Sequence, residues 1–119
     1  MITISFEFDH YPIGKQCYTG TAEVEITEAI QARHSRTEAI LIPLQRPLKR
    51  RLKSAKLVGV RKNLYSRDDL ERYVMGRYWL VIDPLAYEQV ALMNDMPDWA
   101  QYYHKISQVA LEKLRENRW

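Results

Sequence analysis

Apolar and polar residues alternate strictly near the N-terminus. Residues 2–9 read Ile-Thr-Ile-Ser-Phe-Glu-Phe-Asp, and residues 18–27 resume the alternation around Val24. A period of two is typical of a strand that buries one face. Residues 10–15 lie between the two segments and contain Pro and Gly, which favour a turn. We therefore predict a long antiparallel β-hairpin with one apolar face and one acidic face.

The segments that follow the hairpin give weaker signals. Residues 27–36 are compatible with a helix capped by Thr27, and equally with a strand that turns at its end. Residues 39–44 form a short apolar run of the length of a buried strand. Because proline cannot donate a hydrogen bond to a neighbouring strand, we expect this strand to end at Pro43 or to lie at a sheet edge.

Two more elements are predicted before the middle of the chain. Pro47 precedes residues 48–53, a pattern typical of a one- or two-turn helix that has proline at its first position. Leu48 and Leu52 lie four residues apart, so both face inward on such a helix. Residues 56–62 are then predicted to form a strand.

The second half of the chain is predicted to be mainly helical. Ser66 caps a short helix, and the apolar run 78–82 follows as a strand. Asp83 and Pro84 are typical of a helix start, with Asp as the cap and Pro at the first position. The helix that starts there is expected to bury three apolar residues: Leu85, Leu92 and Met93.

Asp98 caps the final helix that the pattern predicts. Apolar residues recur along it at intervals of three and four and form a wide stripe: Trp99, Tyr102, Tyr103, Ile106, Val109, Ala110 and Leu114. We expect this helix to pack on the sheet. The predicted fold class is therefore α+β, an N-terminal antiparallel hairpin or sheet packed against C-terminal helices. The length of 119 residues indicates a single compact domain, residues 1–119.

Positive charge is concentrated in one part of the chain. Residues 39–67 hold nine of the 18 Lys and Arg and none of the 15 Asp and Glu, although the formal net charge is only +3. Such a separation creates a directed field that attracts anionic partners. These nine cations, together with Tyr65, which lies between them in the sequence, are called the basic band. Its members are Arg46, Lys49, Arg50, Arg51, Lys53, Lys56, Arg61, Lys62, Tyr65 and Arg67.

Two kinds of anionic partner suit the basic band. The first hypothesis is a small non-enzymatic accessory protein that binds nucleic acid, DNA or RNA, through phosphate contacts, with Tyr65 stacked on a base. The alternative is a protein-interaction module, such as a small inhibitor or adaptor, that docks the band on an acidic protein. A third interpretation is purely structural: the cations pair with carboxylates of the hairpin or of the last helix.

Signals for catalysis or metal binding are weak. His10, His34, His104 and Cys17 lack the spacing of metal ligands, so we predict no metal and no cofactor. A small nuclease that uses His10 as a base and Asp83 as a ligand is the third function considered. Helix capping explains Asp83 without any catalytic role, so we expect no enzyme.

A single cysteine excludes a disulfide within the chain and indicates a reducing compartment, so the expected location is the cytoplasm. The N-terminal residues do not resemble a signal peptide. No apolar run approaches the roughly 18–20 residues of a membrane span, and we expect no membrane partner. The edge of the hairpin and the stripe of the last helix are both compatible with a homodimer.

Overall fold

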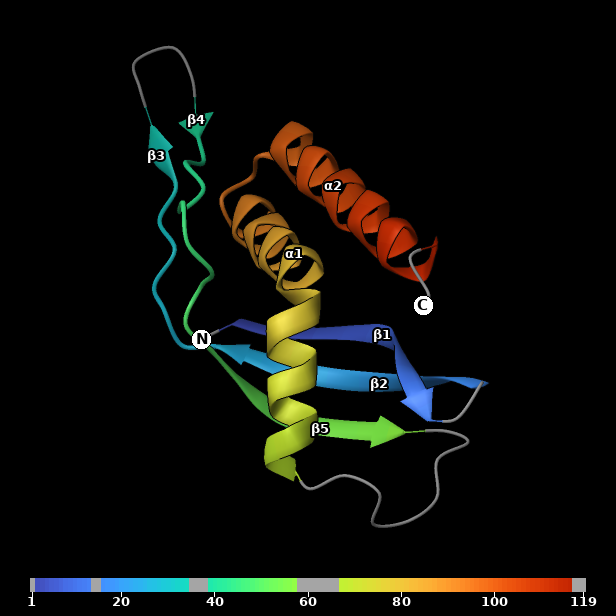
Figure 1. Ribbon diagram of the computed structural model, residues 1–119. Helices are drawn as coiled ribbons and strands as arrows, with labels where there is room; N and C mark the ends of the chain where they lie inside the picture. Colours follow the sequence, from blue (N-terminus) through green and yellow to red (C-terminus); the bar gives the residue numbers. More distant parts are fainter. Residues whose placement is uncertain (1, 14–15, 35–38, 58–66, 117–119) are drawn as a thin grey trace.

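A three-stranded antiparallel sheet crossed by a long helix forms the base of the molecule (Figure 1). The computed structural model describes residues 2–13, 16–34, 39–57 and 67–116. The elements follow one another in this order: β1 (Ile2–Ile13), β2 (Gln16–Ile26), β3 (Arg33–His34), β4 (Ala39–Ile40), β5 (Arg50–Leu57), α1 (Arg67–Met93) and α2 (Pro97–Glu116). The chain has the predicted α+β architecture, with the sheet first and both helices after it.

β1 and β2 form the predicted hairpin. Ile4 lies opposite Val24 and Phe6 opposite Ala22, and all four side chains are buried. They share one face because alternate residues of a strand point to the same side. The hairpin prediction is confirmed, although β1 extends to Ile13, through residues that we predicted as turn.

Residues 50–57 form strand β5, so the helix predicted for residues 48–53 is wrong. β5 pairs antiparallel with β2, and the sheet order is β1-β2-β5. Leu48 and Leu52 are both buried, as expected. Residues four positions apart lie on the same face of a strand and also on the same face of a helix. The spacing of Leu48 and Leu52 therefore cannot distinguish a strand from a helix. The strand predicted for residues 56–62 overlaps the end of β5, and its remainder lies outside the described residues.

The chain between β2 and β5 forms a separate two-stranded sheet. Residues 27–32 are irregular and lead into β3, which pairs with β4 and lies beside the two helices (Figure 1). The strand predicted for residues 39–44 is limited to Ala39–Ile40. Leu41 is buried, whereas Ile42 and Leu44 remain exposed.

One helix, α1, occupies the region where we predicted a helix, a strand and a second helix. Its buried apolar residues recur at helical spacing: Val74, Tyr78, Val81 and Ile82. The Tyr78 ring lies 5.8 Å from the rings of both Phe6 and Phe8, centroid to centroid, which places this side of α1 on the sheet. Packing on the sheet therefore overrides the strand propensity of residues 78–82.

The end of α1 also differs from the prediction. Leu85 is half-buried, but Leu92 and Met93 are 62% and 76% exposed. The amide of Met96 donates to the carbonyl of Ala91 at 2.8 Å and closes the turn between the helices. This turn brings Met96 into the core in place of the two residues that we expected there.

The final helix, α2, is confirmed, and it begins at Pro97, one residue before the predicted cap. It packs against α1, whereas we expected it on the sheet (Figure 1). The rings of Tyr87 and Tyr103 stack at 5.2 Å between the two helices. The small residues Ala100 and Ser107 are buried, which allows the helices to approach closely.

Candidate interaction surfaces

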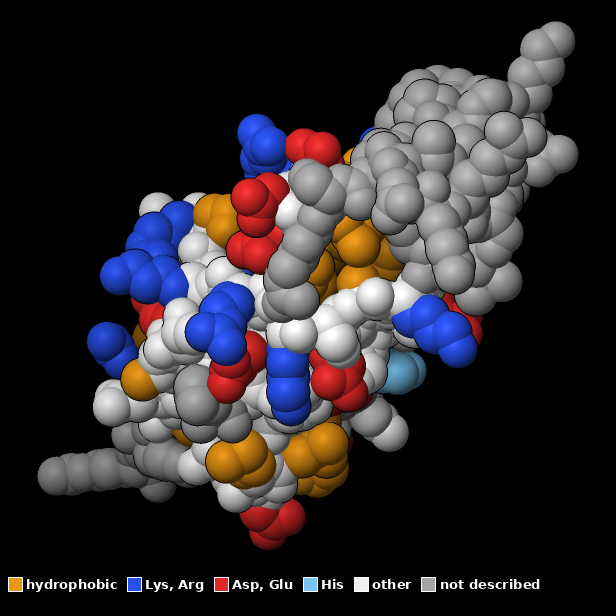
Figure 2. Space-filling model, turned by 90° about the horizontal axis from the view of Figure 1, so that it is seen from below, with side chains coloured by type: hydrophobic (Ala, Val, Ile, Leu, Met, Phe, Trp, Pro, Cys, Tyr) orange, Lys and Arg blue, Asp and Glu red, His pale blue; other side chains and the backbone are white. Residues whose placement is uncertain are grey.

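The described residues of the basic band include surface cations that pair with carboxylates and a buried arginine. Arg51 lies 3.9 Å from Glu25 and Lys53 lies 4.0 Å from Glu23, both carboxylates being on the neighbouring strand β2. The face seen in Figure 2 accordingly shows Lys and Arg side chains interspersed with Asp and Glu. The acidic side of the hairpin thus lies against the cations, which lowers the positive potential at that surface.

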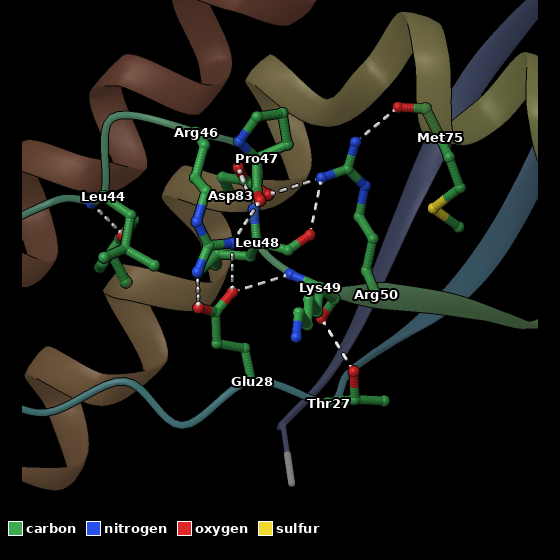
Figure 3. A network of polar contacts seen from close by, with 11 residues as sticks. Thr27, Glu28, Leu44, Arg46, Pro47, Leu48, Lys49, Arg50, Met75 and Asp83 are labelled. Carbon is green, nitrogen blue, oxygen red and sulfur yellow. Dashed lines mark hydrogen bonds and ion pairs between the residues drawn. The ribbon is translucent and has the colours of Figure 1, made fainter.

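Arg46 makes the closest of these pairs, in the chain that leads into β5. Its two terminal nitrogens contact both carboxylate oxygens of Glu28, at 2.5 and 3.2 Å (Figure 3). The amide of Lys49 also donates to this carboxylate, at 3.0 Å. The side-chain hydrogen bond from Arg46 is the main cause that lowers the pKa of Glu28 below its usual value. Bidentate geometry makes this the most directional ion pair of the band.

Arg50 is not available to a partner, because its side chain is only 9% exposed. One terminal nitrogen donates to the carbonyl of Leu48 at 3.0 Å and lies 3.4 Å from a carboxylate oxygen of Asp83. The other donates to the carbonyl of Met75 in α1 at 2.7 Å (Figure 3). Arg50 therefore ties the start of β5 to α1.

Asp83 is the second part of this connection. Its other carboxylate oxygen accepts the amide of Leu48 at 3.1 Å. Burial raises the pKa of Asp83, and burial likewise lowers the pKa of Arg50. Both directions mean that desolvation outweighs the mutual attraction of the pair. The capping interpretation of Asp83 was wrong, because the residue lies within α1 and holds β5 against it.

The remaining cations of the band are less well defined by the structure. Lys49 and Lys56 are exposed. Arg67 is the first residue of α1. Arg61, Lys62 and Tyr65 lie outside the described residues, so the predicted stacking role of Tyr65 stays a prediction.

Asp83, one of the two residues named in the nuclease hypothesis, has a structural role. Its carboxylate is buried and accepts hydrogen bonds from the Leu48 amide and from Arg50. His104 lies with Nδ1 at 2.9 Å from a Glu88 carboxylate oxygen, between the two helices. Within the described residues, no group of three or more His, Cys, Asp and Glu side chains could hold a metal ion. Neither described helix is both long and apolar enough to cross a membrane.

An apolar groove lies between the two helices, and we call it the α1–α2 groove. It has a volume of about 680 Å³, and it is lined by Leu80 from α1 and by seven residues from α2: Tyr102, Lys105, Ile106, Val109, Ala110, Lys113 and Leu114. Leu80 is 49% exposed and Tyr102 is 53% exposed. Ile106 and Val109 extend the exposed strip.

A smaller hollow of about 200 Å³ continues the groove toward Pro43 and Leu44 and shares Leu80, Tyr102 and Ile106 with it. Pro84 lies one helical turn after Leu80. Proline lacks an N–H and its ring clashes with the carbonyl four residues earlier, so it bends a helix at this point. Figure 1 shows α1 changing direction along its length, so that its first half crosses the sheet and its second half lies beside α2.

The sequence contained a signal for this groove that the stripe prediction overlooked. Seven apolar residues at intervals of three and four cover more than one face of a helix. In the structure one face, with Ala100 and Tyr103, is buried on α1, whereas a second face, with Tyr102, Ile106 and Val109, stays exposed. The width of the stripe was therefore the sign of two apolar faces, one buried on α1 and one exposed.

Comparison with known proteins adds no further indication. No family model matches this chain, and neither a curated protein nor a solved structure matches it.

Proposed function

We propose that this protein is a non-enzymatic protein-interaction module, and that the α1–α2 groove is its main contact surface. The observation that carries the proposal is the contiguous set of exposed apolar side chains on two adjacent helices, Leu80, Tyr102, Ile106 and Val109. An exposed apolar patch bordered by polar residues is a common feature of interaction sites. The expected location remains the cytoplasm, from the single cysteine.

The composition of the groove supports a protein partner. Most of its lining is apolar, and the ends of Lys105 and Lys113 supply charge at its border. An apolar centre bordered by polar groups is the usual arrangement of protein interfaces, in which a tyrosine is often an energetic hot spot. Tyr102 is the candidate for that role.

The test is a matched pair of charge insertions on α2. Ile106→Glu places a carboxylate in the groove, whereas Gln108→Glu places one at an exposed position that does not line it. We expect affinity capture with the tagged full chain to lose its bound protein in the Ile106→Glu variant and to retain it in the Gln108→Glu variant. Equal recovery of the same partner with both variants would contradict the proposal.

Nucleic-acid binding through the basic band is the second candidate function. The observation that favours it is a series of exposed cations along β5 and the residues before it: Lys49, Arg51, Lys53 and Lys56. The pairs to Glu23 and Glu25, at 4.0 and 3.9 Å, are long, so a phosphate could compete for these cations.

A salt titration with a generic duplex and a single strand tests this second function. Phosphate contacts predict that the logarithm of the binding constant falls linearly with the logarithm of the salt concentration, by about 0.7–0.9 per contact. The variant Glu23→Gln/Glu25→Gln removes the competing carboxylates and should tighten binding. A flat salt response, or unchanged binding in this variant, would contradict it and leave an acidic protein as the partner of the band.

A further inference from the structure

We propose that a second copy of this chain occupies the α1–α2 groove, with its α2 packed antiparallel against α2 of the first. This inference rests on the proposed function, because it names the partner of the same surface. Three features of the helices support it: the spacing of the exposed residues of α2, the charges beside them and the shape of α1.

The spacing of residues on α2 is that of a coiled-coil seam. Four residues that line the groove follow one another at steps of four, three and four, Tyr102, Ile106, Val109 and Lys113, and Glu116 continues the spacing. This 3-4 alternation keeps one row of side chains facing a partner helix. α1 leaves this row exposed, since Tyr102, Ile106 and Val109 are 53%, 36% and 42% exposed, whereas the buried residues of α2 are Ala100, Tyr103 and Ser107. The exposed side of the row is therefore accessible to a partner helix.

The charges on the seam exclude a parallel arrangement of two α2 helices. In a parallel pair each seam residue meets its own copy, so Lys113 would face Lys113 and Glu116 would face Glu116. Like charges at such positions destabilise the pair. In an antiparallel pair Ile106 lies opposite Val109 of the second copy, and the two-fold axis repeats this apolar layer. Tyr102 then lies opposite Lys113 of the second copy, where the lysine stem and ammonium can cover the ring.

The charges beside the seam select one antiparallel register. Lys105 and Glu112 occupy equivalent positions seven residues apart on the outer flank of the seam. With Ile106 opposite Val109, Lys105 of each copy faces Glu112 of the other, which gives two ion pairs. A shift of one heptad in either direction brings Lys105 against Lys105 or Glu112 against Glu112. Complementary flanking charges are the usual determinant of register and orientation in helical pairs.

The shape of the groove provides space for the second helix. The row from Tyr102 to Lys113 spans about 17 Å, at a rise of about 1.5 Å per residue. The first half of α1 crosses the sheet and lies away from α2 (Figure 1), and Leu80 is the residue of α1 that lines the groove.

The test is a charge exchange measured by sedimentation equilibrium of the full 14.2 kDa chain. We expect a concentration-dependent dimer for the wild type. Lys105→Glu and Glu112→Lys each turn two attractions into two repulsions, so each single variant should weaken dimerisation by roughly tenfold. The double variant Lys105→Glu/Glu112→Lys restores both pairs in exchanged form and should recover dimerisation to within about threefold of the wild type.

Two further variants keep the result interpretable. Ile106→Glu should be monomeric and Gln108→Glu should dimerise like the wild type, with circular dichroism showing that both fold. A wild type that stays monomeric, or single charge variants that the double variant does not rescue, overturns the second-copy inference. If the wild type is monomeric while Ile106→Glu still loses a different captured protein, the inference fails and the proposed function stands. If Ile106→Glu changes neither the captured protein nor dimerisation, the second-copy inference and the proposed function both fail.

Discussion

The carboxylate of Asp83 lies 3.4 Å from the guanidinium of Arg50, at the point where strand β5 meets helix α1. The two residues are 33 positions apart in the sequence, and each also bonds to the backbone. Asp83 accepts the amide of Leu48, and Arg50 donates to the carbonyls of Leu48 and Met75. The pair therefore fixes the angle at which β5 enters the sheet beneath α1. Its charges are largely removed from water, so each depends on the other.

Removal of Asp83 should destabilise the fold strongly. Asp83→Ala leaves the Arg50 charge buried without its counter-ion and the Leu48 amide without its acceptor, so we expect a loss of about 3 kcal/mol in the free energy of unfolding. Asp83→Asn keeps an oxygen for the Leu48 amide and should lose less. Urea denaturation measures both. The exposed control Glu116→Gln should stay within about 0.5 kcal/mol of the wild type. If Asp83→Ala lowered the free energy of unfolding by no more than about 0.5 kcal/mol, as expected for the control, the Asp83–Arg50 pair would not be a structural connection.

Glu28 and Arg46 form a second connection, at the surface, and predict a pH dependence. The pKa of Glu28 is lowered, so its folded form binds a proton less readily than its unfolded form. The stabilisation by Glu28 is then present above its ordinary pKa of 4.5 and is lost as the pH falls through the folded value. Glu28→Gln should lower Tm at pH 7, and the difference from the wild type should vanish at low pH. Glu7→Gln, at an exposed position of β1, is the control. A Tm difference that is independent of pH would contradict this prediction.

Tyr103 is expected to make the stability of the fold depend on pH at the alkaline end of the scale. Its hydroxyl donates to the carbonyl of Leu41 at 3.2 Å, and burial raises its pKa from 10.0 to about 12. The folded protein therefore holds this proton more tightly than the unfolded chain, so stability falls as the pH rises from about 10 to about 12. Tyr103→Phe removes the titrating group and should show a shallower fall of Tm over that range. At pH 7 it should cost about 1 kcal/mol for the lost hydrogen bond. Parallel Tm profiles of the two proteins above pH 10 would contradict the assignment.

Local patterns predicted the parts of this fold that local interactions determine. The hairpin depends on the alternation around Phe6 and Val24, and such a period is visible in the sequence itself. The long helix α1 was missed because residues 78–82 have strand propensity and Asp83-Pro84 has the chemistry of a helix start, whereas packing on the sheet decides the outcome.

Local sequence patterns were likewise insufficient to predict the candidate surfaces, because these depend on packing between distant segments. The basic band was visible as a charge count, but its pairing with Glu23 and Glu25 depends on β2 lying beside β5, across more than 25 residues of sequence. The α1–α2 groove is lined by residues of two helices, and the sequence pattern divided the first of them into separate elements. Spacing along one segment carries no information about which distant segment packs against it.

The bend at Pro84 can be tested by restoring the missing amide. In Pro84→Ala the new N–H at position 84 can donate to the carbonyl of Leu80, which should straighten α1 and narrow the groove. We expect hydrogen exchange at position 84 to be slow, as inside a regular helix. Pro97→Ala is the matched control, because the first residue of α2 has no acceptor within its own helix and its new amide should exchange fast. Fast exchange at both positions would mean that packing, and not the proline, holds α1 bent. The groove would then persist in Pro84→Ala, and dimerisation through it should be unchanged.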